Sequence, residues 1–318
     1  MKSLLFILTI VVSLSSPAES LRLEGQPYQP PTNIDIVCQA TNALPHGLWI
    51  YKVTPEAFSA AAISNALRIC HFQTKDLSKG EHPVFKDPHL IYFFNANESN
   101  LRQFLYIAPT LGGMDYNSQW DYKIPIEGVP SSDEAETLAR DILFQLGIDR
   151  SSLADKVQKG YDDTSTRYDR QHNQVTPTQV IRRGVAFARR IDGIPLSDSR
   201  CFLIHFGIHS RIEDFSLFWR NIQRYESRQV LTKEQIIEMI KLGMAVLPEQ
   251  FGDLTDLNTA KRLVITKITP RYYNGVGKEA LDFIYPYADL EMTAATGSTN
   301  TTTFFLSCPI LSTNLGNP

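Results

Sequence analysis

The chain has 318 residues, of which 43% are hydrophobic, 10% aromatic and 20% charged. This composition is typical of a globular protein of one or two domains, and it excludes a disordered, collagen-like, coiled-coil or multi-span membrane protein. The 31 basic and 34 acidic residues give a formal net charge of −3. No long-range attraction to nucleic acid or anionic lipid is therefore expected, and no nucleic-acid partner is predicted.

Residues 1–20 have the order of a secretory signal peptide. Lys2 precedes the apolar run 4–12, and small residues follow it. The run is shorter than the ~20 residues that a membrane span requires. Cleavage is predicted after Ala18 or Ser20, with an uncleaved signal anchor as the alternative. We therefore expect a secreted, periplasmic or extracellular protein without a membrane span after cleavage.

Export to an oxidising compartment favours disulfides for the cysteines. The chain has four of them, Cys38, Cys70, Cys201 and Cys308. We favour Cys38 with Cys70 and Cys201 with Cys308, because each pair falls within one half of the chain; buried free thiols are the alternative. No Cys-x-x-Cys motif occurs and no histidine lies at zinc-finger spacing, so neither a metal nor a cofactor is predicted.

The first half of the chain is predicted to hold a lead-in and one folded unit. Residues 21–45 contain four prolines and few apolar residues, which predicts an extended lead-in. An N-terminal α+β unit is expected over 46–128. Its predicted elements are a strand over 47–53, a helix that begins at Thr54-Pro55, and strands over 90–94 and 101–108.

The second α+β region is predicted over 129–318, and it divides into about 129–228 and 229–318 if it holds two units. Helices are expected to begin at the capping boxes Ser131–Glu134 and Thr232–Gln235. Strands are predicted over 180–191, 201–206, 211–219, 263–268, 283–292 and 303–306. In the first of these, Gly184, Ala186 and Ala188 share one face, where a helix is expected to approach closely.

This alternation of single amphipathic helices with two or three antiparallel strands predicts an α+β fold. Each helix is expected to pack on one face of a curled antiparallel sheet.

Several clusters of charged residues are candidates for chemistry. A glycosidase needs two carboxyl groups that flank the scissile bond, and the candidates are Asp162-Asp163, Glu213-Asp214 and Asp253 with Asp256. Surface solvation is the simpler interpretation of each. The densest basic set is Arg182, Arg183, Arg189 and Arg190. We expect these arginines to keep the two ends of a buried strand in water.

A group of aromatic residues is the candidate binding surface, because such rings offer apolar faces with polar tips to a peptide or glycan. The group consists of Trp219, Tyr272, Tyr273, Tyr285 and Tyr287, with Trp120. Packing in the core is the alternative. Asn97 and Asn300 begin Asn-x-Ser/Thr sequons and are glycosylation candidates if the host glycosylates.

The segment 187–195, FARRIDGIP, follows a predicted strand and precedes a predicted hairpin. This order resembles PepSY-like extracytoplasmic modules and is similar to the regulatory domains of the YycH and YycI type, over about 131–306. The resemblance implies repeated helix-plus-hairpin units that bind or restrain other proteins outside the cytoplasm without catalysis. The chain departs from that type because no retained anchor and no attached peptidase or kinase segment is expected.

The predicted function is that of an exported, noncatalytic module that binds a protein or peptide. Binding is expected through an added strand at a sheet edge or in an aromatic groove. One alternative is a secreted hydrolase that acts on glycan or peptide through an unrecognised carboxylate pair. The other is a structural component of the envelope.

Overall fold

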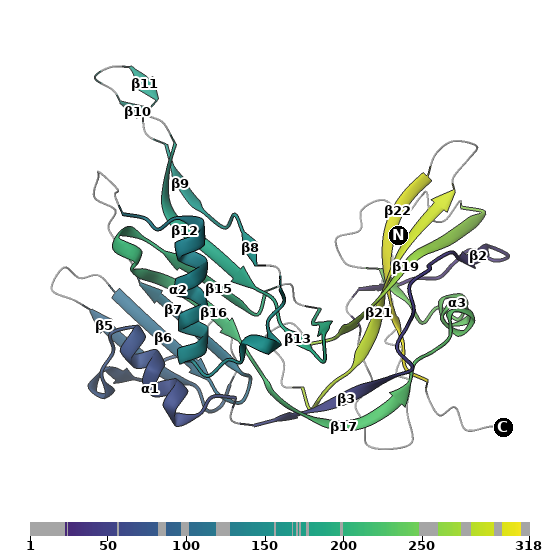
Figure 1. Ribbon diagram of the computed structural model, residues 1–318, viewed down its shortest axis with the longest axis horizontal. Helices are drawn as coiled ribbons and strands as arrows, with labels where there is room; N and C mark the ends of the chain where they lie inside the picture. Colours follow the sequence, from purple (N-terminus) through teal and green to yellow (C-terminus); the bar gives the residue numbers. More distant parts are fainter. Residues whose placement is uncertain are drawn as a thin grey trace, which may run out of the picture. The chain divides into compact units, whose positions relative to one another are not determined.

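The computed structural model in Figure 1 describes most of residues 23–312. The positions outside the description within this range are 24, 56, 82–86, 97–101, 119–127, 156, 167, 170, 172, 176–177, 198–199, 248–259, 275–280 and 296–300. The predicted signal peptide and the glycosylation candidates Asn97 and Asn300 lie outside the described residues. In the described part of the chain, no helix is long and apolar enough to cross a membrane.

The chain divides into two compact units, each made from segments distant in sequence. Unit 1 comprises the described residues of Met1–Lys52, Gln223–Tyr273 and Asp282–Pro318. Unit 2 comprises those of Val53–Ile222 and Asn274–Leu281.

Unit 2 is built on a nine-stranded sheet in which neighbouring strands are antiparallel. The strand order is β4-β5-β6-β7-β16-β15-β12-β8, and β9 also pairs with β12. The bounds are β4 Leu77–Ser78, β5 Ile91–Ala96, β6 Arg102–Ala108, β7 Gly113–Ser118, β8 Gln158–Lys159, β9 Asp163–Ser165, β12 Gln179–Phe187, β15 Phe202–Phe206 and β16 Ile212–Phe218. Two short hairpins extend from it, β10 Tyr168–Asp169 with β11 Gln174–Val175, and β13 Arg190–Ile191 with β14 Ile194–Pro195.

Two helices of unit 2, α1 (Ala60–Ile69) and α2 (Ser132–Gln145), lie on the same face of this sheet (Figure 1). Their buried alanines let them approach the sheet, and they share one core with apolar residues of β5, β6, β7, β12, β15 and β16. The predicted capping box of α2 is confirmed: the Ser131 hydroxyl accepts from the Glu134 N–H, and the Glu134 carboxylate accepts from the Ser131 N–H at 2.8 Å. The predicted start of α1 at Thr54-Pro55 is wrong, because Ser59 caps the helix by accepting from the Ala62 N–H.

Unit 1 contains a six-stranded sheet of order β1-β18-β22-β21-β19-β2 and a three-stranded sheet of order β17-β3-β20. The bounds are β1 Gln26–Pro27, β2 Asp35–Cys38, β3 Gly47–Thr54, β17 Asn221–Gln229, β18 Val246–Leu247, β19 Arg262–Tyr272, β20 Phe283–Ile284, β21 Pro286–Ala295 and β22 Thr301–Pro309. Helix α3 (Lys233–Lys241) contacts β2 and β22. Its predicted capping box at Thr232 and Gln235 is confirmed.

The predicted fold of repeated helix-plus-hairpin units is wrong. The protein is mostly β, with three α-helices and several large sheets among the described residues. Strand β7 pairs with β16, so strands expected in separate units form one sheet. The prediction failed because alternation of apolar residues identifies a strand but not its partner.

The expected helix contact at the Gly184 face of β12 is also wrong. Val185 and Phe187, on the other face, belong to the core that α1 and α2 share. A Cβ at Gly184 would lie 2.1 Å from the carbonyl oxygen of Tyr161. The absence of a side chain at Gly184 therefore admits a neighbouring backbone segment rather than a helix.

Candidate functional site: the open face of the large sheet

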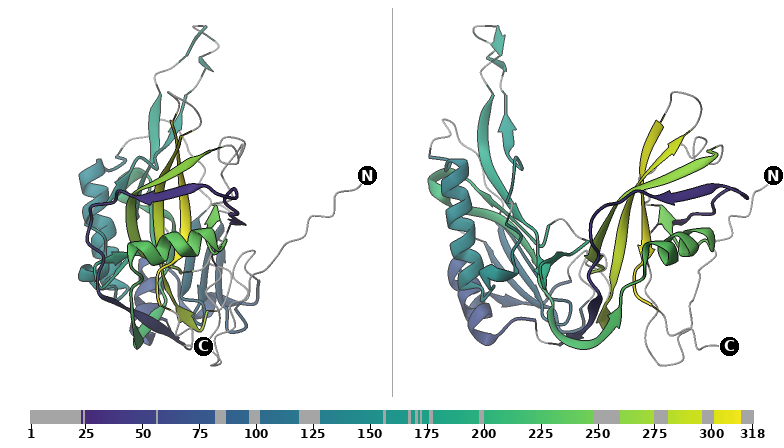
Figure 2. Two further views of the ribbon diagram at one scale, coloured as in Figure 1. Left: turned by 90° about the vertical axis from the view of Figure 1, so that its right-hand side faces the viewer. Right: turned by 45° about the vertical axis from the view of Figure 1, so that its right-hand side comes forward.

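The face of the nine-stranded sheet opposite α1 and α2, here called the open face, carries two groups of side chains that define the candidate site. Figure 2 shows both helices on one side of this sheet. Phe93 and Leu105 belong to the core on the helix side of the sheet. Because successive residues of a strand point to opposite faces, the residues directly before and after them in sequence point to the open face. The strand register aligns one row of the open face as Phe94, Phe104, Asn117, Asp214, His205 and Gly184.

The first group, the aromatic strip, lies on β5 and β6. It consists of Tyr92, Phe94, Phe104 and Tyr106, all of which are half-buried. Ring centroids are 4.7 Å apart for Tyr92 and Tyr106, 5.4 Å for Phe94 and Phe104, and 6.4 Å for Phe104 and Tyr106. Burial, together with the charge and hydrogen bond of Tyr106, raises the pKa of Tyr92 to about 12. The strip is therefore an uncharged aromatic surface at neutral pH.

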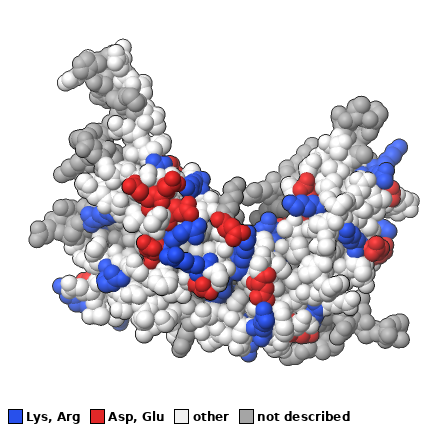
Figure 3. Space-filling view, in the orientation of Figure 1, with Lys and Arg blue, Asp and Glu red and all other residues white. Residues whose placement is uncertain are grey.

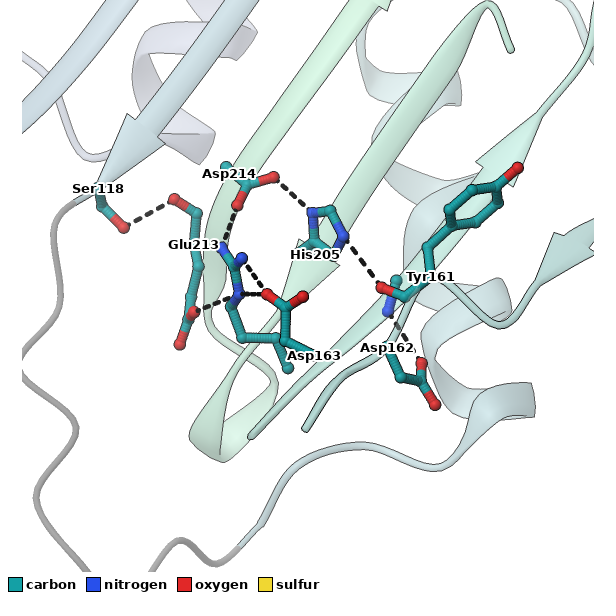
Figure 4. Close-up of polar contacts among 9 residues, drawn as sticks. Ser118, Tyr161, Asp162, Asp163, His205, Glu213 and Asp214 are labelled. Atoms are coloured by element: carbon teal, nitrogen blue, oxygen red, sulfur yellow. Dashed lines mark hydrogen bonds and ion pairs between the residues drawn. The ribbon is translucent and has the colours of Figure 1, made fainter. Parts of the chain in front are cut away.

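The second group, the charged cluster, lies on β9, β12, β15 and β16 (Figure 4). Arg182 forms ion pairs with Asp163 and Asp214. His205 Nδ1 lies 2.6 Å from Asp214 Oδ1, and His205 Nε2 lies 3.1 Å from the carbonyl oxygen of Tyr161. Both ring nitrogens face acceptors, so the ring satisfies both contacts only as the doubly protonated imidazolium.

Glu213 anchors the buried end of the charged cluster. Its side chain is only 3% exposed, and its Oε2 lies 3.7 Å from Arg182 Nε. A Cβ at Gly207 would lie 1.6 Å from Glu213 Oε1, so the carboxylate packs directly on the glycine backbone. The Ser118 hydroxyl donates to the Glu213 carbonyl oxygen at 2.8 Å and ties β7 to this bulge of β16.

The His205–Asp214 pair has the composition of two members of a catalytic triad. A general base needs a free Nε2 toward its nucleophile, whereas this Nε2 is bonded to the Tyr161 carbonyl oxygen. Asp163, Glu213 and Asp214 each contact Arg182, which occupies the space that a substrate would need between them. The pairing fastens the 161–163 segment to the sheet rather than activating a nucleophile.

The state of His205 makes the stability of unit 2 depend on pH. Burial opposes the charged ring, but the hydrogen bond and charge of Asp214, helped by Asp163, outweigh it and raise the pKa of His205. The pKa of His205 is therefore higher in the folded protein than in the unfolded chain, where it is about 6.5. Protonation of His205 stabilises the fold fully below about pH 6.5, and this stabilisation is lost as the pH rises through the pKa of the folded state. Urea unfolding should show that wild type exceeds His205→Gln in unfolding free energy by more at about pH 5.5 than at about pH 9. A difference that is constant or grows with pH contradicts the imidazolium assignment.

The arginines in β12 and just after it differ from the prediction that they keep the strand ends in water. Arg183 pairs with Asp162 and donates to the Pro130 carbonyl oxygen at 3.2 Å. Arg190 pairs with Asp155 at 2.7 Å. The prediction is wrong for Arg189, which is only 7% exposed. These arginines are held by ion pairs and by stacking on an aromatic ring instead of extending into solvent. The sequence of one strand does not show such contacts with distant residues.

Other charged residues lie on the helix side of unit 2. Figure 3 shows acidic and basic side chains intermingled there. Lys159 contacts Asp133 at 2.7 Å and Glu136 at 3.2 Å, and Arg140 pairs with Glu136 at 2.9 Å. Paired charges of this kind are typical of a solvated surface and contribute little energy. No group of three or more His, Cys, Asp or Glu residues with metal-binding geometry occurs among the described residues.

The aromatic residues predicted as a binding group do not form one group within a unit. Trp219 belongs to unit 2, whereas the four tyrosines belong to unit 1. Tyr272 and Tyr287 are buried, and Tyr272 packs edge-on against Tyr51 at 5.4 Å. Tyr273 and Tyr285 are half-buried. Trp120 lies outside the described residues, as do the candidate carboxylates Asp253 and Asp256.

The four cysteines are free thiols in the structure, so the favoured pairs Cys38–Cys70 and Cys201–Cys308 are not formed in it. Cys70, Cys201 and Cys308 are buried, and Cys38 is half-buried. The Cys201 thiol donates to the Phe187 carbonyl oxygen at 3.2 Å. Burial raises the pKa of Cys70 well above its ordinary value and that of Cys308 to about 12. Both thiols are therefore protonated and unreactive at neutral pH.

No known protein family matches this chain, and no curated protein matches it. Nine chains among the solved structures do match. One is the crystal structure of an uncharacterized protein from Eubacterium rectale, which is 12% identical, with a TM-score of 0.43 over 87% of this chain and 88% of that chain. A likeness of this degree supports no statement about function. The resemblance to PepSY-like modules stays a prediction.

Proposed function

We propose that this protein is an exported, noncatalytic binding protein that docks a protein or peptide on the open face of the nine-stranded sheet. The observation that carries the proposal is the aromatic strip, which lies on the face that α1 and α2 leave uncovered. The export part of the proposal depends on residues 1–20 alone.

The aromatic strip has the chemistry of an interface. Tyrosine and phenylalanine supply large contact areas at a low cost in side-chain entropy, and aromatic residues are enriched where proteins bind one another. Four such rings held half-buried against one another are also largely fixed before a partner arrives. Pre-ordered side chains reduce the entropy that binding costs.

The rest of the open face suits an extended partner. Between the aromatic strip and the charged cluster, the register places Asn117 and Asp115 on β7 and Ser216 on β16. From β5 to β16 the sheet spans about 14 Å, at about 4.8 Å per strand interval. An extended peptide of about four residues has that length. One end would rest on aromatic rings, and the other would meet the paired charges as a polar rim.

Selection of binding peptides tests this proposal directly. The immobilised protein is used to select from a display library of random peptides, and enriched sequences are synthesised and titrated by isothermal calorimetry. We expect saturable binding with a negative heat-capacity change, because apolar surface is buried. Absence of any saturable peptide, or turnover of the selected peptides by the protein, contradicts the proposal.

A further inference from the structure

A buried arginine lies in unit 2 apart from the charged cluster. Arg189, directly after β12, is only 7% exposed. Its guanidinium stacks on the Trp219 ring, 4.1 Å from the ring centroid. Its Nη1 donates to the Arg220 carbonyl oxygen at 2.7 Å. Its Nε is buried without a hydrogen-bond partner, and no carboxylate among the described residues pairs with it.

A second buried polar group without a partner belongs to the same cluster. Arg220, whose carbonyl oxygen binds Arg189, donates from Nη1 to the Asn274 carbonyl oxygen at 2.8 Å. Asn274 is only 2% exposed, and its N–H donates to the Ser197 hydroxyl at 3.2 Å. Its Oδ1 has no hydrogen-bond partner.

The electrostatics of Arg189 call for an anion. Among the described residues, the Trp219 ring and the Arg220 carbonyl oxygen offset part of the hydration that the buried Arg189 guanidinium loses, and neither carries a negative charge. Burial lowers the pKa of Arg189 to about 10 despite the opposing effect of Cys201, so the group stays charged at neutral pH. Since Nη1 is occupied, the remaining Nε–Nη2 edge is the side that binds a carboxylate through two parallel hydrogen bonds.

We propose that Arg189, stacked on Trp219, binds a carboxylate group of a ligand. Two oxygens of a phosphate can accept from the same pair of donors, so the test compares acetate with phosphate. This site is independent of the open face, and it gives Trp219 a role in orienting the guanidinium rather than in forming an aromatic groove.

Thermal unfolding with sodium acetate as the probe tests the site. Acetate is titrated against sodium chloride at matched ionic strength. At acetate concentrations well above the dissociation constant, the wild-type melting temperature should rise by about 2 °C or more relative to chloride. Arg189→Met should abolish this rise, and it should not destabilise the protein in chloride, because it removes an uncompensated buried charge. Arg190→Met, which changes the neighbouring half-buried arginine that pairs with Asp155, should keep the wild-type response.

The outcomes separate the alternatives. No acetate-specific rise in wild type, or the same rise in Arg189→Met, overturns the proposal. A rise with phosphate but not with acetate overturns the assignment to a carboxylate. If Arg189→Met does not fold, Arg189→Lys is used in its place. Lysine keeps the positive charge but lacks the planar pair of N–H donors, so this variant should lose most of the acetate response. An unchanged response would contradict carboxylate binding through two parallel hydrogen bonds.

Discussion

Substitution of Gly184 by alanine is expected to destabilise unit 2 by about 3 kcal/mol. The added Cβ would lie 2.1 Å from the Tyr161 carbonyl oxygen and 2.7 Å from its carbonyl carbon, and backbone atoms have no rotamer by which to escape. The same carbonyl oxygen accepts from His205, and the Gly184 N–H donates to Asp162 at 3.2 Å. Displacing the 161–162 segment therefore breaks both hydrogen bonds in addition to the packing.

Urea unfolding measures this effect, and Gly193→Ala is the matched control. Gly193 has a φ of +79° but nothing within 4 Å of its added Cβ, so it should cost only about 1 kcal/mol from backbone conformation. In Gly184→Ala the His205 ring should also titrate at a lower pKa by nuclear magnetic resonance, because it loses a hydrogen bond to its charged form. If Gly184→Ala costs less than Gly193→Ala, the Tyr161 segment does not lie against β12 as described.

Elements set by local chemistry could be predicted from the sequence. The capping boxes at Ser131 and Thr232 and the hairpin of β15 and β16 all involve residues close in sequence. The Asp192-Gly193 dipeptide, which is typical of a tight turn, likewise forms one, with both residues at positive φ between β13 and β14. Such signals specify a backbone conformation directly.

The sheet order could not be predicted, because it depends on pairings between distant segments. Residues 113–118 meet 214–218 across the middle of the large sheet, and β2 joins β19 in parallel. Each of these strands carries apolar residues in a short pattern that would suit many other partners. The resemblance carried by 187–195 concerns a short hairpin, and it does not determine how the surrounding strands pair.

The candidate site was visible only in fragments. Asp162-Asp163, Glu213-Asp214 and the arginines of β12 stood out as separate clusters, and only the register places Asp214 opposite His205. The aromatic strip could not be predicted from the sequence, because the consecutive residues Tyr92, Phe93 and Phe94 are all aromatic and do not alternate with polar residues. With no polar residue in that run, the sequence does not show which face is open.

Loss of peptide binding on truncation of the aromatic strip is the second large effect expected. Phe104 contacts Tyr92, Phe94 and Tyr106 through its ring and occupies the centre of the strip. Truncating a central aromatic residue of an interface costs about 2 kcal/mol or more, which is about 30-fold in affinity. Because the ring is only half-buried, Phe104→Ala should still fold, which circular dichroism verifies.

The most direct test of the open face as the binding surface is the ratio of dissociation constants for one selected peptide with Phe104→Ala and Phe144→Ala. Phe144 is also in unit 2, but it lies on α2 and is 65% exposed on the opposite side of the sheet. We expect Phe104→Ala to weaken binding by about 30-fold or more and Phe144→Ala to leave it unchanged. Equal effects of the two substitutions, or a loss confined to Phe144→Ala, would place the binding surface elsewhere.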